Sequence, residues 1–252
     1  MRGPVHLDRR GPVLEARGLR KSFKGIDAVQ GIDVVVAPGE RVGLLGPNGA
    51  GKTTTLLMLL GAVTADSGTI TIAGHRLPRG RSAAMEQVGF AAGYLPLPER
   101  LKVGEALRVF AGWYGLRDER RAVASALEHF EITHLEKRLC SELSSGQRTL
   151  VGIVKATLHR PALLVLDEPT ASLDPDIALK VRLGLLEVCA TTGAALLVTS
   201  HDMREVEMLT ERVVFLARGN VVADDTPAAV ASRYGYDDLE QVFLSLAAEH
   251  GR

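Results

Sequence analysis

The sequence predicts an α/β fold in which a mainly parallel sheet follows an antiparallel β subdomain and is interrupted by a helical insert. Short β-type runs separated by glycine fill residues 13–36. Near-continuous apolar runs occur at residues 41–46, 162–168 and 194–200, as in parallel strands that are covered on both faces. Apolar residues recur at spacings of three and four between residues 103 and 130, which indicates amphipathic helices.

Length and charge restrict the class of protein. The chain has 252 residues, enough for one large domain or for a core domain with an insert. Its 30 basic and 30 acidic residues cancel, so net charge gives no reason to expect a nucleic-acid partner. Cys140 and Cys189 lie far apart without metal-ligand spacing, so we expect both to be small buried hydrophobes.

We expect a loose arm at the start of the chain and regular structure near its C-terminus. Residues 1–12 hold charge and no apolar stretch, so we expect a loose arm rather than a secretory signal, and no window reaches the ~18 apolar residues of a membrane-spanning helix. A closing hairpin is predicted from Arg212 onward. An amphipathic helix is predicted at about residues 236–249, with its apolar residues facing inward. These residues are Leu239, Val242, Phe243 and Leu246.

One domain is expected over residues 13–252, and its core comprises residues 13–85 and 161–230. The helical insert is expected at about residues 86–160, with a last helix that begins near Ser145 and stops before the proline at 161. Its opening stretch, residues 88–107, is rich in small residues and contains two prolines. We expect neither a helix nor an ordinary strand there, but a hinge between two lobes.

The run "GPNGAGKT" at residues 46–53 fits G-x-x-x-x-G-K-[ST] and lies between a predicted strand and a predicted helix. Glycines let backbone N–H groups form a concave phosphate nest, and the helix N-terminus adds positive charge. Lys52 supplies a charge for the β and γ phosphates, and Thr53 offers a hydroxyl to Mg²⁺. The alternative is a plain glycine-rich turn, which would not need a strand before it and a helix after it. The candidate nucleotide-binding residues are Gly46, Pro47, Asn48, Gly49, Ala50, Gly51, Lys52, Thr53 and Thr54.

Two further stretches can complete a phosphoryl-transfer site. Asp167 ends an apolar run, where a carboxylate can hold Mg²⁺, and Glu168 can polarise an attacking water. "LSSGQ" at residues 143–147 places small hydroxyl residues and a glycine at the start of a helix. Alone, such a stretch is most often only a helix cap, but it can also bind an anion.

Taken together, these motifs make the chain resemble the ATP-binding cassette (ABC) transporter ATPases. "GPNGAGKT" is similar to their Walker A, "LSSGQ" to their signature and "LLVLDEP" to their Walker B. "ASLD" is similar to their D-loop and "TSHDM" to their switch histidine loop. The order and spacing of the five motifs agree with the family from about Val13 to Leu246.

The resemblance implies a head-to-tail dimer that holds two ATP molecules and Mg²⁺, either a homodimer or a paired cassette. It implies that Glu168 is the general base, that His201 contacts the γ-phosphate and that Phe23 stacks on adenine, although Phe23 could instead be a core residue. It also implies that Thr53 and Asp167 bind the metal. The residues implied to act across the interface are Ser144, Ser145, Gly146, Gln147 and Asp174.

The resemblance leaves the biological role open between several classes. A single cassette implies separate transmembrane permease subunits and a location in the cytoplasm, on the inner face of the membrane. The ending "DLEQVFLSLA" is similar to bacterial export-type cassettes. The alternatives are a nucleotide switch with weak hydrolysis and a non-transport ATPase. The compact insert and the balanced charge argue against a nucleic-acid-linked enzyme.

One position departs from the family. A glutamine is usual in the loop that joins the core to the helical insert, but Gly93 stands in its place and no glutamine occurs at residues 88–107. The resemblance implies that this glutamine reaches Mg²⁺ and relays nucleotide occupancy to the permease. Mg²⁺ tolerates a water-rich shell, so we expect coupling to be affected more than nucleotide binding.

Overall fold

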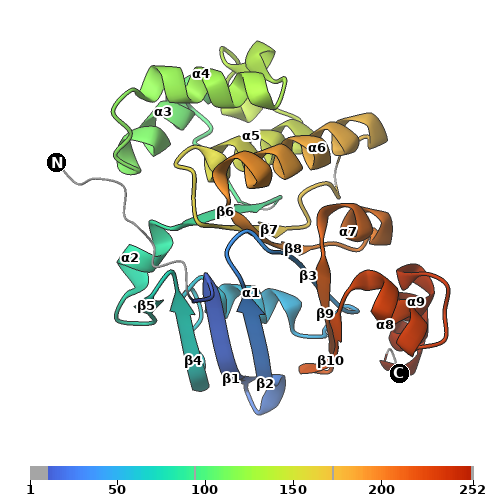
Figure 1. Cartoon of the computed structure of the whole chain (residues 1–252). Coiled ribbons are helices and arrows are strands. Elements are labelled where there is room, and N and C mark those ends of the chain that lie inside the picture. The colour runs from blue at the N-terminus through green and yellow to red at the C-terminus, as the bar shows by residue number, and fades with distance from the viewer. Residues whose placement is uncertain (1–10, 94, 172, 251–252) are drawn as a thin grey trace.

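The computed structural model describes residues 11–93, 95–171 and 173–250, so residues 1–10 of the predicted arm lie outside it. Its strands form two sheets (Figure 1). The antiparallel sheet has the order β2 (Ile26–Val36), β1 (Leu14–Phe23), β4 (Ser67–Ile72), β5 (His75–Arg76). The second sheet has the order β10 (Asn220–Asp225), β9 (Arg212–Ala217), β3 (Arg41–Leu45), β8 (Ala195–Thr199), β7 (Leu163–Asp167), β6 (Val88–Ala92).

Neighbouring strands in the second sheet are parallel except β9 and β10, which form the predicted closing hairpin. The apolar run of β7 shows why the sheet is buried on both faces. Leu164 and Leu166 pack into one hydrophobic cluster, whereas Leu163 and Val165 pack into another. Successive side chains of a strand point to opposite faces, so an uninterrupted apolar run requires cover on both sides. The predicted α/β fold with a mainly parallel sheet and an antiparallel β subdomain is confirmed.

Helices supply that cover (Figure 1). Helix α1 (Lys52–Leu59) lies between the two sheets, and α2 (Arg81–Met85) precedes β6. On the other face lie α5 (Ser145–Thr157) and α6 (Pro175–Thr192), with α3 (Val103–Trp113) and α4 (Glu119–His129) beyond them. Short 3₁₀ turns occur at Thr133–Leu135 and Cys140–Glu142. None of the helices in these described ranges has the length and apolar character needed to cross a membrane.

The C-terminal elements pack beside β9. They are α7 (Met203–Leu209), α8 (Pro227–Arg233) and α9 (Leu239–His250). In α9, Leu239, Val242 and Leu246 are buried and Phe243 packs against the same cluster, which confirms the predicted inward face. Both cysteines are free thiols and buried, as predicted.

The predicted start of the helical insert at residue 86 is wrong. Residues 88–92 form β6, an edge strand that pairs in parallel with β7 over its whole length. It contains few β-branched residues, and tertiary pairing overrides this weak local propensity. The prediction that no ordinary strand occurs in residues 88–107 is therefore also wrong for its first five residues. The irregular stretch lies between β6 and α3.

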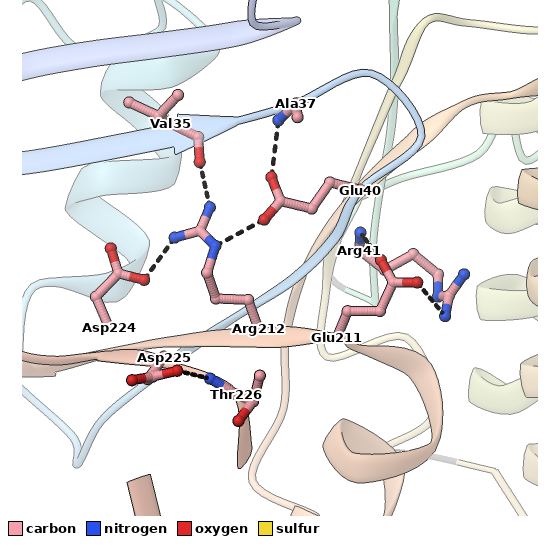
Figure 2. A network of polar contacts seen from close by, with 9 residues as sticks. All are labelled: Val35, Ala37, Glu40, Arg41, Glu211, Arg212, Asp224, Asp225 and Thr226. Atoms are coloured by element: carbon pink, nitrogen blue, oxygen red, sulfur yellow. Dashed lines mark hydrogen bonds and ion pairs between the residues drawn. The ribbon is translucent and has the colours of Figure 1, made fainter. Parts of the chain in front are cut away.

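A polar network joins the two sheets where β9 begins (Figure 2). Arg212 on β9 donates to Glu40 Oε1 at 2.7 Å, to Asp224 on β10 and to the carbonyl of Val35 on β2. The backbone N–H of Ala37 donates to the other oxygen of Glu40 at 2.7 Å. One guanidinium thus connects β2, β9, β10 and the turn before β3, which helps to fix how the antiparallel sheet sits on the parallel one.

Candidate functional site

A cavity of about 560 Å³ lies where β3, β6, β7 and β8 end. Ligands of α/β sheets usually bind at the carboxyl ends of the strands, where the loops can be shaped without disturbing the core. Six of the predicted nucleotide-binding residues line this cavity: Asn48, Gly49, Gly51, Lys52, Thr53 and Thr54. Asp167, Glu168, His201 and Gly93 line it as well.

The glycine-rich loop holds Lys52 inside the fold. The ammonium donates to the carbonyls of Gly46 at 2.6 Å and of Pro47 at 3.1 Å, and the residue is only 9% exposed. Burial lowers the pKa of Lys52, whereas the nearby charges of Glu168 and Asp167 raise it, and the net direction is down. Two loop carbonyls therefore hold the ammonium of Lys52, and phosphate oxygens could take their place as its hydrogen-bond acceptors.

Gly51 shows why this loop requires glycine. Its φ is +103°, and a Cβ atom built there would lie 2.5 Å from the carbonyl oxygen of Ala28. No L side chain fits a contact of that length, and the left-handed backbone adds strain for any residue except glycine. The turn can thus bring the N-terminus of α1 to the cavity only with glycine at this position.

Acidic and hydroxyl side chains gather where β7 and β8 end. The hydroxyl of Thr199, at the end of β8, donates to Asp167 Oδ1 at 2.6 Å and accepts from the backbone N–H of Glu168 at 3.1 Å. His201 Nε2 lies 2.6 Å from Glu168 Oε1. Thr199 thus orients the carboxylate of Asp167 and fixes the backbone of Glu168, whose own carboxylate makes a direct contact with His201.

The backbone of Glu168 is strained. Its φ is +50°, a left-handed conformation that is uncommon for a residue with a side chain. Such a conformation persists where neighbouring groups fix it, and it is frequent at functional sites. The backbone N–H of Glu168 is fixed by two acceptors, the carbonyl and the hydroxyl of Thr199.

The signature residues lie elsewhere. A second cavity, of about 410 Å³, is lined by Ser144, Ser145, Gly146 and Gln147 together with Asp174. Ser144 is the N-cap of α5: its hydroxyl accepts from the backbone N–H of Gln147, and the side chain of Gln147 accepts from the backbone N–H of Ser144, both at 3.2 Å. Ser144 and Gln147 thus form a capping box at the start of α5, and these residues line a cavity other than that of Lys52.

The remaining predicted residues are placed as follows. Gly46, Pro47 and Ala50 belong to the loop around Lys52 but do not line the cavity. Phe23, at the end of β1, does not line it either. Its side chain is 47% exposed and lies 5.4 Å from the ammonium of Lys21, so it is not a core phenylalanine.

Sequence reasoning gave no role to Ala28, to Ala171 within "ASLD" or to Thr199 within "TSHDM". Ala28 and Ala171 line the cavity only because the fold brings them there, and their sequence carries no chemical signal. Thr199 carries a weak signal, since it is the hydroxyl residue that ends an apolar strand predicted to lie in the same sheet as Asp167. Hydroxyl residues at such strand ends could have been considered as partners of the carboxylates.

Comparison with known sequences agrees with the motifs. The profile of a family described as "ABC transporter" matches residues 29–171. The chain is 33% identical to the linearmycin resistance ATP-binding protein LnrL of Bacillus subtilis (strain 168), over 92% of this chain and 75% of that protein. It is 36% identical to the Nod factor export ATP-binding protein I of Paraburkholderia xenovorans (strain LB400), over 90% of this chain and 75% of that protein.

Comparison with solved structures agrees with the fold. A structure described as the ATP binding subunit of an ABC transporter superposes with a TM-score of 0.86 at 29% identity. The superposition covers 93% of this chain and 99% of that chain. The similarity therefore includes both sheets and the helical insert.

Proposed function

The chain belongs to the ABC transporter family as an ATP-binding subunit, and on this premise we propose that it is a Mg²⁺-dependent ATPase that drives separate membrane subunits in the export direction. The contact between Glu168 and His201, on the wall of the cavity that holds Lys52, carries the proposal. A protein that only binds nucleotide has no need of a carboxylate fixed at this point. We therefore favour turnover over a switch with weak hydrolysis.

The residues of the cavity divide the chemistry of ATP hydrolysis between them. Lys52 exchanges its carbonyl partners for phosphate oxygens and places positive charge where negative charge develops. Glu168 accepts the proton of the attacking water as general base. His201 fixes the direction of that carboxylate from 2.6 Å and contacts the γ-phosphate. The loop around Lys52, from Gly46 to Thr54, binds the phosphate chain through backbone N–H groups.

Two oxygen groups of the cavity fit Mg²⁺. The hydroxyl of Thr53 and the carboxylate of Asp167 would hold the ion, and hard oxygen donors of this kind are the ones it prefers. Within the residues that the structure describes, no cluster of three His, Cys, Asp or Glu forms a complete metal cage, which suits an ion that keeps waters and phosphate oxygens. Bound Mg²⁺ would neutralise phosphate charge, and Thr199 orients Asp167 toward this task.

A dimer would complete the site. Ser144, Gly146 and Asp174 line a cavity other than the one that Lys52 lines. A second cassette, either a copy of this chain or a paired subunit, would bring its signature to the nucleotide at Lys52 in a head-to-tail arrangement. The N-terminus of α5 would then direct its partial positive charge at the phosphates.

The outer face of α3 is the proposed contact with the permease. Trp113 is 76% exposed and Val109 is 42% exposed, one helical turn apart. A shallow cavity of about 520 Å³ beside them is also lined by Arg108 and Arg120. Apolar groups that are exposed together on a helix mark a surface for a partner. We place the subunit on the cytoplasmic side of the membrane, held there by this contact.

Two observations support the export direction: the names of two relatives and the C-terminal sequence of this chain. One relative is named for linearmycin resistance and another for Nod factor export. The C-terminal "DLEQVFLSLA" is of the kind found in export-type cassettes, and it folds as α9 against β9. The nature of the exported molecule would be set by the membrane subunits. With a net charge of zero, the chain has no general attraction for nucleic acid.

Two substitutions test the proposed reaction. Glu168→Gln is expected to lower steady-state hydrolysis about 10²-fold or more, as loss of a general base does, while ATP still binds and a dimer accumulates on size-exclusion chromatography. Lys52→Ala is expected to abolish nucleotide binding. Glu128→Gln, an exposed change on α4, is the control. Unchanged turnover in Glu168→Gln would show that the general base lies elsewhere.

A further inference from the structure

Glu205 on α7 is a buried carboxylate that the reaction proposed above does not use. It is 1% exposed, and among the residues that the structure describes no other Asp or Glu is buried. A carboxylate removed from water requires strong hydrogen bonds to compensate for its lost hydration. The burial of this carboxylate, four residues after His201, therefore needs a specific cause.

The hydrogen bonds of Glu205 connect two loops. Thr170 Oγ1 donates to Glu205 Oε1 at 2.6 Å, and Ser200 Oγ donates to Glu205 Oε2. Both hydroxyl residues are themselves buried, with exposures of 7% and 4%. Thr170 comes two residues after Glu168, and Ser200 comes directly before His201. Each oxygen of one carboxylate thus binds one of the two loops that carry the proposed general base and the switch histidine.

The surroundings act on the charge of Glu205 in opposite directions. Burial raises its pKa, the hydrogen bonds from Ser200 and Thr170 and the charge of Arg182 lower it, and Asp202 raises it, with a net upward direction. Asp202 also caps α7 by accepting from the backbone N–H groups of Arg204 and Glu205. The helix is thereby fixed at its first turn, so the carboxylate is presented from a rigid element.

We propose that Glu205 is a positioning residue: by binding Thr170 and Ser200 together, it holds the loops of Glu168 and His201 at the separation their 2.6 Å contact requires. The proposal rests on the proposed ATPase function. It also explains how the left-handed backbone of Glu168 is maintained, because Thr199 fixes the N–H of that residue and Glu205 fixes the chain two residues later.

Steady-state kinetics of the full-length chain test the proposal. Glu205→Ala and the near-isosteric Thr170→Val are expected to lower kcat about 10- to 100-fold, the usual effect of losing a group that orients a catalytic side chain. The KM for ATP and ATP binding by equilibrium dialysis should change less than about threefold, because the loop around Lys52 is untouched. Glu205→Gln keeps one acceptor oxygen and should recover part of kcat. Glu207→Gln, an exposed change on the same helix, should behave as wild type.

A double-variant cycle separates positioning from stability. In a Glu168→Gln background, Glu205→Ala should cause little further loss of the residual turnover, because its effect passes through the contact between Glu168 and His201, which Glu168→Gln already alters. A full further loss, or a matched fall in ATP binding, would overturn the positioning role. Wild-type kcat in the folded Thr170→Val variant would overturn it too. If Glu168→Gln itself turned over like wild type, the proposed reaction would fail instead, and the two failures are therefore distinct.

Discussion

Gly93 lies on the cavity wall at the position where the resemblance implies a glutamine. Its backbone is not left-handed, and among the described residues the atom that a Cβ there would meet is Thr149 Oγ1, at an ordinary 3.6 Å. The fold therefore does not require glycine, in contrast to Gly51, where a Cβ would lie 2.5 Å from a carbonyl oxygen. The absence of a side chain at residue 93 is a property of the site, and it would leave a bound Mg²⁺ with fewer protein oxygens than the resemblance implies.

Gly93→Gln is expected to lower the Mg²⁺ concentration for half-maximal ATPase activity by about two- to tenfold, the worth of one added polar contact. Gly93→Ala is the matched control, because it fills the same first-atom space without adding an oxygen. Titration of Mg²⁺ at saturating ATP, with and without the permease, measures the effect. If the glutamine variant and the alanine variant behaved alike and both kept wild-type permease stimulation, residue 93 would have no special role.

The sequence singled out residues where a motif carries the chemistry, and the structure places Lys52 and Asp167 on one cavity and Ser144 on another. The sequence did not predict Glu205 or Thr199, because each acts through a partner about 30 or more residues away in the chain. Their local sequence shows only an acidic residue in a helix and a hydroxyl residue at a strand end. These hydrogen bonds form only because the fold places β7 and β8 side by side.

At the scale of elements, α5 and β6 are packed backbone to backbone. A Cβ atom at Gly89 would lie 2.1 Å from the carbonyl oxygen of Ala156 and 2.8 Å from the side chain of Leu164. The helix that begins with the signature therefore rests directly on the edge strand that leads to Gly93. The predicted hinge begins only after this strand, and β6 was missed because "VGFAA" has little local strand propensity and gains its order from α5 and β7.

Gly89→Ala is expected to destabilise the fold by about 1–3 kcal/mol, because added volume in a packed interface forces the backbones apart. Gly152→Ala on α5 is the matched control, because its added methyl group meets none of the described residues within 4 Å. Glycine inside a helix costs about 0.5–1 kcal/mol relative to alanine, so this variant should be at least as stable as wild type. Urea unfolding followed by circular dichroism compares the two. A stability equal to wild type in Gly89→Ala would mean that α5 and β6 can separate at little cost.

At the scale of the whole molecule, the Arg212 network ties the antiparallel sheet to the parallel one (Figure 2). Burial alone would raise the pKa of Glu40, but hydrogen bonds from Arg212 and from the Ala37 N–H outweigh it, and the net direction is down. A carboxyl with a lowered pKa in the folded state stabilises the fold above its unfolded pKa. That stabilisation is lost as the pH falls through the folded value.

Glu40→Gln is expected to lower the free energy of unfolding at pH 7 by no more than about 1 kcal/mol, since the pair is partly exposed. The difference from wild type should shrink as the pH falls below about 4.3, the ordinary pKa of Glu, because the wild-type carboxyl then loses its charge. Thermal unfolding at several pH values measures this. A difference that stayed constant from pH 7 to pH 3 would contradict the assigned role of the ion pair.

The strand order also determines when the site can form during synthesis. Strand β3, which leads into the phosphate loop, lies between β8 and β9, so residues 46–194 must be made before its first neighbour exists. At ~5–20 residues per second this takes on the order of ten to thirty seconds. Through that interval the fully buried Val42, Leu44 and Leu45 have no strand beside them. A newly made chain therefore cannot build the sheet around its phosphate loop until β8 has been made.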